Sequence, residues 1–271
     1  MEWEDEGWIE VEVPDIDHLP SDVYMRSQNL APREAFPPHA HRWNQLVYGT
    51  SGTMMVTLEH SRHIITPEQA IWVPTGTVHT TGSVRGAEFR NLYIADSARC
   101  AATVGCAVYR VTPLLRQLII EFERVAPDGR DEEYRGRLAE LLQDQIMRLE
   151  KIDFHLAWPH SAALRKLCEA LYANPADERS MRDWGQALGA SSRTLARRFE
   201  RETGLAWREW RRRLRLFRAI EWLAADRPVT SIALDLGYGS ASAFSYMFRE
   251  ATGYSPSAWL RRNLSASRTL N

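Results

Sequence analysis

Between about residues 20 and 97, apolar and polar residues alternate in short runs that glycine and proline separate. The runs are Val23–Arg26, Gln45–Tyr48, Thr53–Leu58, Ala70–Val73 and Glu88–Ile94. A period of two places every second side chain on one face of a β-strand, while glycine and proline favour turns. Many short strands at this spacing predict an antiparallel barrel or sandwich, which we place at residues 18–98.

After Val111 the apolar residues recur at a helical period instead. They form two series: Leu114, Leu115, Leu118, Ile119 and Phe122, then Leu138, Leu141, Leu142, Ile146 and Leu149. This spacing predicts a pair of amphipathic helices at residues 112–152. Their apolar stripes could pack on the barrel of the same chain or on a second copy, and we expect the pair to form the contact of a homodimer.

The last hundred residues contain one unit twice, at about residues 181–203 and 230–252. Each unit is a short apolar helix, a turn with glycine and a second amphipathic helix, which is the helix-turn-helix pattern. Equivalent landmarks are 49 residues apart, as in Leu195 with Phe244 and Gly204 with Gly253. The sequence therefore predicts an all-α domain at residues 161–262 and a two-domain α+β chain.

Charge divides along the same boundary, although the net charge is only -1. Residues 160–271 contain 19 Lys and Arg against 11 Asp and Glu, whereas residues 1–159 contain 15 against 24. A basic half that coincides with two helix-turn-helix units indicates a polyanionic partner, and we expect double-stranded DNA at promoter sites.

The second helix of a helix-turn-helix unit enters the major groove, where its first residues touch base edges. Helical spacing turns Leu195, Phe199, Phe244 and Phe248 toward the core. The residues left on the groove side are Ser192, Arg193, Ala196 and Arg197 in the first unit, and Ser242, Ser245, Tyr246 and Arg249 in the second. Because arginine can hydrogen-bond guanine with two nitrogens, we expect the first unit to contribute more base reading than the second.

These residues resemble the AraC/XylS-type transcriptional regulators, whose C-terminal domain has two helix-turn-helix units joined by a long helix. The resemblance covers residues 161–262 and is most specific from Ile232 to Arg261. It implies base-facing roles for Arg193, Ala196, Arg197, Ser242, Ser245 and Tyr246. One departure is Gly185, where the family often has alanine, and we expect it to loosen the leading helix slightly. RNA polymerase is a further partner to expect of a promoter-bound regulator.

Three histidines among the predicted strands are candidates for one site. His39 and His41 are two apart and would share a strand face, while the turn Pro74–His79 delivers His79. The pattern resembles the cupin fold, a jelly-roll barrel whose HxHxxxE and PxGxxH motifs supply three His and one Glu to a metal. Gln45 stands in the Glu position here. Such a set could hold Zn, Ni, Cu or Fe, or the histidines could form a metal-free pocket.

A barrel of this kind encloses a cavity that inward aromatic and polar side chains line. Trp43, Tyr48, Trp72 and Tyr93 are the candidate lining residues. The resemblance to AraC/XylS-type regulators implies that a small-molecule effector binds in this cavity.

Cys100, Cys106 and Cys168 have no metal-binding spacing, and the acidic start of the chain has no features of a secretion leader. No apolar run approaches the roughly 20 residues that span a bilayer. We therefore expect reduced thiols, a cytoplasmic location and no membrane partner.

The sequence predicts a sequence-specific transcriptional regulator that responds to an effector and is not an enzyme. One alternative is a metal-dependent cupin dioxygenase or isomerase with an appended helical domain, which the absence of an obvious acid–base carboxylate beside the histidines disfavours. The other is a non-catalytic protein whose helical repeats bind another protein, and salt-insensitive binding would indicate it.

Overall fold

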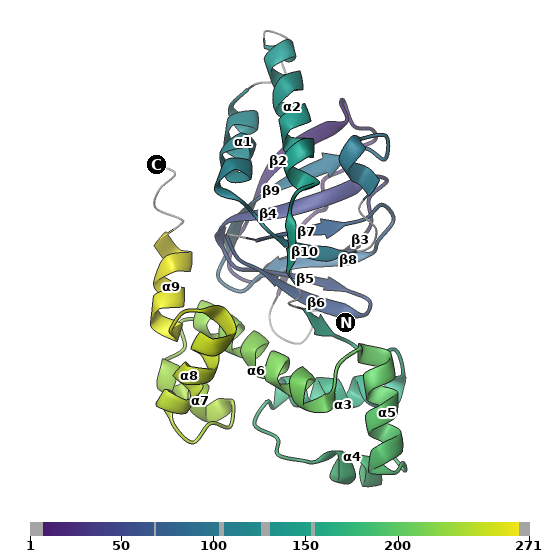
Figure 1. The fold of residues 1–271 in the computed structure, drawn as a ribbon, viewed down its shortest axis with the longest axis vertical. Helices are drawn as coiled ribbons and strands as arrows, with labels where there is room; N and C mark the ends of the chain where they lie inside the picture. The colour runs from purple at the N-terminus through teal and green to yellow at the C-terminus, as the bar shows by residue number, and fades with distance from the viewer. Residues whose placement is uncertain (1–7, 68, 103–105, 126–130, 153–154, 266–271) are drawn as a thin grey trace. The chain divides into compact units, whose positions relative to one another are not determined.

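The computed structural model describes residues 8–67, 69–102, 106–125, 131–152 and 155–265, so the acidic start at residues 1–7 lies outside the described residues. The chain divides into two compact units. Of the described residues, the first unit holds 8–58 and 63–152, and the second holds 59–62 and 155–265 (Figure 1).

The first unit is a sandwich of two sheets whose strands run antiparallel, apart from the parallel pair β1–β3. One sheet has the order β1 (Ile9–Glu10), β3 (Glu34–His39), β8 (His79–Ser83), β5 (Met54–Leu58) and β6 (Ser61–Ile65). The other has the order β11 (Glu150–Ile152), β10 (Ala107–Arg110), β7 (Gln69–Val73), β4 (Asn44–Gly52), β9 (Ala87–Ile94) and β2 (Val23–Leu30). A short 3₁₀ helix spans Arg99–Ala102.

A buried apolar cluster joins the facing sides of the two sheets. Its members are Leu30, Phe36, Val47, Met54, Val56, Ile65, Ile71, Val73, Ala87, Phe89 and Val108. Along β4 the side chains alternate, so that Val47 joins this inner cluster while Leu46 and Tyr48 lie on the opposite face of the sheet. The prediction of a strand-rich, cupin-like N-terminal region is confirmed.

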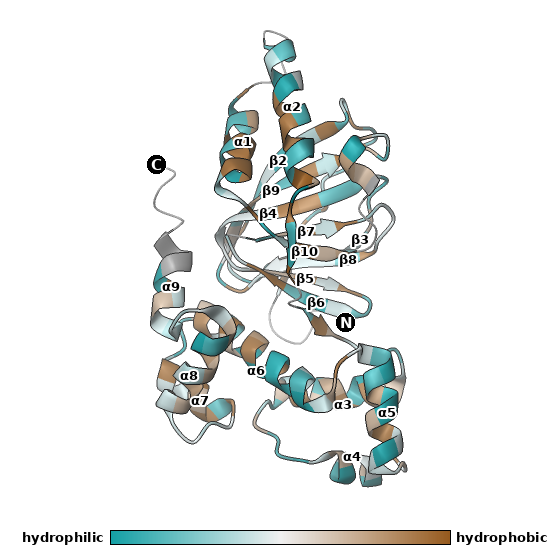
Figure 2. Cartoon of the chain, viewed as in Figure 1, coloured by the Kyte–Doolittle hydropathy of each residue, from teal (hydrophilic) through white to brown (hydrophobic). Residues whose placement is uncertain are grey.

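Two helices cover the outer face of the second sheet, α1 (Pro113–Arg124) and α2 (Glu132–Ile146) (Figure 1). The Thr112 hydroxyl caps α1 by accepting the Leu115 N–H at 3.1 Å. Buried residues of the two helices pack on those of the sheet: Leu115, Ile119, Phe122, Leu138, Leu142 and Ile146 against Leu46, Tyr48, Trp72, Leu92 and Ile94. Figure 2 shows these apolar stretches in brown.

The helical pair therefore packs on its own barrel, the first of the two arrangements that the sequence left open. Leu114 and Leu141 are the parts of the two stripes that stay in solvent, at 56% and 48% exposure. The need of the stripes for a partner, on which the homodimer prediction rested, is largely met within the chain.

The second unit is helical, except for β12 (Leu156–Ala157), which pairs with Ser61 and Arg62. Its helices are α3 (Ala162–Ala173), α4 (Met181–Ala187), α5 (Ser192–Thr203), α6 (Trp207–Ala224), α7 (Val229–Asp235), α8 (Ala241–Thr252) and α9 (Pro256–Ser265). The pairs α4–α5 and α7–α8 are the two predicted helix-turn-helix units, and α6 runs between them (Figure 1). None of the helices described in either unit is long and apolar enough to cross a membrane.

The two units repeat in their hydrogen bonds as well as in their sequence. Ser191 and Ser240 cap α5 and α8, each hydroxyl accepting the backbone N–H three residues later at 3.1 Å. Gly204 and Gly253 end the same helices in the left-handed conformation, with φ of 68° and 79°. Residues that are 49 positions apart in the sequence therefore occupy equivalent positions in the two helix-turn-helix units.

Gly185 in α4 lies close to the backbone of the turn that follows this helix in the first unit. A Cβ on Gly185 would lie 2.5 Å from the carbonyl oxygen of Ala190, a backbone atom, so the turn would have to shift to make room for it. The turn of the second unit is one residue longer, at Gly239, and the matching position holds Ala233. The close approach of the shorter turn gives Gly185 a second role, and the expectation that it loosens α4 slightly stays a prediction.

We expect Gly185→Ala to lower the free energy of unfolding by about 1–3 kcal/mol, the usual cost of forcing an extra carbon into a packed site. Thermal unfolding followed by circular dichroism measures it. If the glycine only loosened the helix, alanine would instead raise stability by about 0.5–1 kcal/mol, so the sign of the change decides. Ala233→Gly, the matched change in the second unit, should cost about 1 kcal/mol.

Candidate functional site

The α5 helix presents the predicted groove side to solvent. Its core-facing residues Leu195 and Phe199 are 3% and 0% exposed. On the opposite side Ser192, Arg193 and Arg197 are exposed and Ala196 is half-buried. The sequence predicted this arrangement, in which the apolar residues of α5 face inward and its arginines face outward.

The α8 helix has the same arrangement with different side chains. Phe244 and Phe248 are fully buried. Among the predicted groove residues, Ser242, Tyr246 and Arg249 are exposed and Ser245 is half-buried. Tyr246 is 70% exposed, so its ring and hydroxyl are open to a partner.

The arginines of α5 differ in what they bind. Arg198 forms an ion pair with Glu202 at 2.9 Å. Neither Arg193 nor Arg197 forms an ion pair within the described residues. Their guanidinium groups therefore keep all their donors for phosphate oxygens or for guanine.

Five of the six arginines of α6 are engaged inside the unit, which sequence reasoning did not predict, while Arg208 is exposed. Arg212 and Arg213 pair with Glu209 at 2.9 and 3.0 Å, and Arg218 pairs with the buried Glu221 at 2.7 Å. Arg211 and Arg215 donate to backbone carbonyls in the segment between α3 and α4. These cations hold the frame between the two units together, and their density on one helix is no sign of DNA contact.

The three predicted histidines converge in the first unit. His39 ends β3, His79 begins β8, and the two residues are partners across the strands. His41 follows in the loop after β3, so a loop brings it to the site, not the shared strand face that the spacing suggested. One nitrogen from each ring lies within 4.8 Å of the others, close enough for one metal ion to bind all three.

Backbone carbonyls orient two of the rings. The Nδ1 atoms of His39 and His79 lie 2.8 and 3.0 Å from the carbonyl oxygens of Pro37 and Thr77, which fixes Nδ1–H as the donor. Nε2 of each ring then carries a lone pair, and His79 Nε2 is buried without a hydrogen-bond partner within the described residues. Metal-binding histidines have this outer hydrogen bond as a rule.

The histidines are neutral at pH 7 because burial disfavours their charged form. Burial, with repulsion from His39 and His79, lowers the pKa of His41 to about 3. Burial and then repulsion from His39 lower the pKa of His79 to about 4, and burial lowers the pKa of His39. Neutral imidazole is the form that ligates metals, so the site needs no deprotonation at neutral pH.

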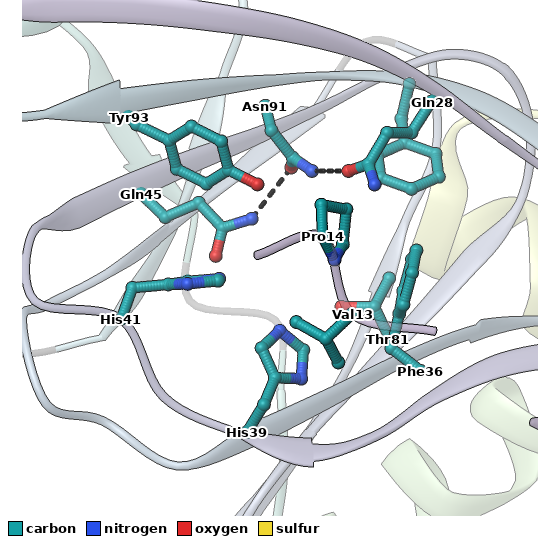
Figure 3. Close-up of a pocket in the computed structure, with 11 residues that line it drawn as sticks. Val13, Pro14, Gln28, Phe36, His39, His41, Gln45, Thr81, Asn91 and Tyr93 are labelled. Carbon is teal, nitrogen blue, oxygen red and sulfur yellow. Dashed lines mark hydrogen bonds between the residues drawn. The ribbon is translucent and has the colours of Figure 1, made fainter. Parts of the chain in front are cut away.

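A chain of amides fixes Gln45 beside the histidines (Figure 3). Gln45 Nε2 donates to Asn91 Oδ1 at 2.8 Å, and Asn91 Nδ2 donates to Gln28 Oε1. With its nitrogen used in this way, Gln45 directs Oε1 toward His41 in Figure 3, and this oxygen is buried without a partner within the described residues. The amide oxygen is therefore available to the pocket as a neutral ligand or hydrogen-bond acceptor.

The pocket is small. Its cavity volume is about 10 Å³, about what one water molecule needs. The side chains around it come from the N-terminal segment and both sheets: Val13, Pro14, Gln28, Phe36, His39, His41, Gln45, Thr81, Phe89, Asn91 and Tyr93. Such a site accepts an ion or a molecule of a few atoms.

Of the four aromatic residues predicted to line the cavity, Tyr93 does so. Trp43 does not line the pocket and is stacked on His41, with ring centroids 5.9 Å apart. Tyr48 and Trp72 do not line the pocket, because they lie on the outer face of the sheet beneath α1 and α2. The prediction for these two residues is wrong: each is one residue out of register with the inward positions Val47 and Ile71.

Sequence reasoning missed Gln28 and Asn91, although the strand period contained a signal. Asn91 is two residues before Tyr93 on β9 and shares its face, in a strand that is otherwise apolar at inward positions. A polar side chain at such a position, only 3% exposed, requires a hydrogen-bond partner or a ligand.

The low pKa values of His41 and His79 make the metal-free protein sensitive to mild acid. As the pH falls below about 6.5, these histidines take up protons in the unfolded chain but stay neutral in the folded one, so stability falls. We expect the urea midpoint, measured with chelator, to be lower at pH 5.5 than at pH 7. The difference should shrink in His41→Gln and persist in the control His18→Gln, which changes an exposed ring.

Comparison with known proteins agrees with this architecture. A profile described as "Helix-turn-helix domain" matches residues 184–262, and one described as "Cupin domain" matches residues 26–94. A cupin sandwich followed along the chain by two helix-turn-helix units defines a DNA-binding regulator.

Relatives identify the family. The chain is 30% identical to the HTH-type transcriptional regulator NimR of Escherichia coli over 83% of this chain and 82% of that protein. It is 28% identical to the HTH-type transcriptional activator RhaR of Pectobacterium carotovorum over 90% of this chain and 94% of that one. Among solved structures, ToxT of Vibrio cholerae covers 90% of this chain and 98% of its own at 14% identity and a TM-score of 0.38. The chain belongs to the AraC-type family of transcriptional regulators.

Proposed function

We propose that the chain binds promoter DNA in the cytoplasm with α5 and α8 in successive major grooves on one face of the duplex. The observation that carries this is the matched pair of capped helices whose groove sides are exposed, with Arg193 and Arg197 free of ion pairs in the described residues. The 18 residues of α6 span about 27 Å, comparable with one DNA turn of about 34 Å.

Selection of bound sequences from genomic and randomised DNA, followed by footprinting, tests this reading. We expect a site with two protected major-groove blocks whose centres are about 10 base pairs apart. A selected site with a single protected block would exclude simultaneous reading by α5 and α8.

Binding to that site should weaken steeply with salt, because lysine and arginine release counterions when they contact phosphates. A protein that makes about 6–10 phosphate contacts loses about 10³–10⁵ in affinity between 50 and 200 mM salt. For one chain we expect a loss of affinity of about 10³ over this range of salt. Fluorescence anisotropy with labelled DNA measures it. A flat dependence would indicate the protein-binding alternative.

The pocket of the first unit is where we place both a metal and the effector. His39, His41 and His79 would hold a divalent transition metal (Zn, Ni, Cu or Fe), with the Gln45 oxygen as a further ligand. Converging neutral rings, carbonyls behind two of them and the unpartnered Gln45 Oε1 support this fit. A bound metal would supply a Lewis-acidic point to which the effector attaches, and metal analysis of purified protein tests its presence.

This pocket would sense its ligand without converting it. In the described residues its lining offers imidazoles, amides, a hydroxyl and a phenol, and no carboxylate for acid–base catalysis. Effector binding changes DNA affinity only if two states of the chain bind the effector differently. The cupin-enzyme alternative would require metal-loaded protein to turn over a small substrate.

A homodimer and contact with RNA polymerase at the promoter complete the proposal. The exposed Leu114 and Leu141 on α1 and α2 are the apolar positions that a second copy could cover. Light scattering of the purified chain at micromolar concentration measures its mass, and a monomer there would remove the dimer from the mechanism.

A further inference from the structure

We propose that the effector of this pocket is a small anion, such as a short monocarboxylate, held between Arg26 and a metal on His39, His41 and His79. The inference rests on the proposed metal site and adds the charge of the ligand. Two features of the pocket carry it: its uncharged lining and an unpaired cation on its face.

The lining would leave a bound metal with its full charge. The side chains from which a metal could take ligands are neutral donors: His39, His41 and Gln45 of the lining, and His79 beside them. Gln45 stands where a cupin carboxylate would contribute a negative charge, and it is 3% exposed. A divalent ion in such buried surroundings is stabilised strongly by an anion, because little water is present to compensate its charge.

Arg26 adds a second positive charge on the same face. It lies on β2 opposite Asn91 in the register, and strand alternation puts it on the face of Gln28, which lines the pocket. Its charge acts on the Tyr93 hydroxyl at the pocket wall, partly opposing the burial that raises the pKa of Tyr93 to about 12. Arg26 is half-buried and forms no ion pair within the described residues.

A carboxylate matches these groups. One oxygen would occupy the open position of a metal with few protein ligands, and a guanidinium nearby is the preferred partner of a carboxylate. Phe36, Phe89 and Val13 leave apolar surface for a short carbon stem.

Acetate and acetamide test the charge, since they have almost the same shape. The full-length protein is loaded with Co²⁺, whose visible absorption reports its ligands, and each compound is titrated in. We expect a saturable spectral change with acetate at a concentration at least about tenfold lower than with acetamide. One nearby opposite charge shifts a protonation equilibrium by about one to three pKa units, so tenfold is the lower limit.

Two substitutions assign the effect to residues. Arg26→Gln should weaken acetate at least about tenfold, and Arg26→Lys, which keeps the charge, should restore most of it. Gln45→Glu should weaken acetate and tighten Co²⁺, because the new carboxylate supplies the missing charge. The matched control is Arg110→Gln, with a cation removed from an exposed position on β10. It should change acetate affinity less than threefold, and circular dichroism confirms that each variant folds.

The outcomes separate this inference from the proposed function. Co²⁺ uptake with acetate preferred over acetamide and lost in Arg26→Gln supports it. Co²⁺ uptake with equal response to both compounds, or an unchanged Arg26→Gln, overturns the anion and leaves the metal in place. Absence of Co²⁺ uptake overturns both, while DNA reading by α5 and α8 is decided by its own selection and footprint.

Discussion

Alanine in place of Arg193 or Arg197 is expected to weaken binding to the selected DNA site by about 5- to 150-fold each. Both side chains leave the exposed side of α5 near its capped start, where a recognition helix meets base edges. A bidentate contact with guanine contributes about 1–3 kcal/mol of discrimination, which is that range in affinity. The loss should therefore be largest for the selected site and small for unrelated DNA.

The measurement is repeated selection with each variant, together with anisotropy on the selected and a scrambled site. Arg198→Ala is the matched control, because Arg198 is on the same helix but already pairs with Glu202. It should leave base preference unchanged and reduce only the salt dependence, if it changes anything. Base preference that survives in both Arg193→Ala and Arg197→Ala would mean that α5 does not read sequence.

Sequence patterns predicted the helical half of the chain well because its repeat fixes the register. Once Leu195 and Phe199 were assigned to the core, the period of the helix placed Arg193 and Arg197 outside without further information. What the pattern could not reveal was which arginines are used internally. Arg211 and Arg215 donate to carbonyls of a segment more than thirty residues earlier in the chain, and such contacts leave no local signal.

The strand half was less predictable. The strand β3 contains Pro37 and Pro38, and β8 reads His79 to Ser83 with no large apolar residue, so neither showed the expected alternation. The two strands nevertheless position the histidines. Their motif spacing was more informative here than hydrophobicity, because it reflects the ligand set and not burial.

The prediction that Tyr48 and Trp72 line the cavity was wrong for a related reason. In a strand covered on both faces, large apolar residues occupy both sides, and burial alone cannot tell the inner face from the outer. Tyr48 and Trp72 belong to the side that α1 and α2 cover. Polar residues at inward positions, Asn91 and Gln45, marked the pocket more reliably than its aromatic rings did.

Replacing His39, His41 and His79 together by alanine is expected to abolish metal uptake while leaving DNA binding intact. The three ring nitrogens are the proposed ligands, and they come from β3, the following loop and β8 of the first unit. Loss of an outer-shell partner alone costs about 10- to 100-fold in metal affinity, so loss of the ligands should cost more. Metal content of purified protein and Co²⁺ titration measure the uptake, and anisotropy on the selected DNA site measures binding.

His18→Ala is the control for the triple variant, because His18 is an exposed ring in the same unit. It should keep about one metal per chain and any ligand-dependent change in DNA affinity. In the triple variant that change should disappear, because a ligand alters DNA affinity only through differential binding to two states of the chain. Full metal uptake by the triple variant would place the metal elsewhere. Loss of DNA binding with normal thermal unfolding would mean that the histidines act on DNA affinity without a ligand.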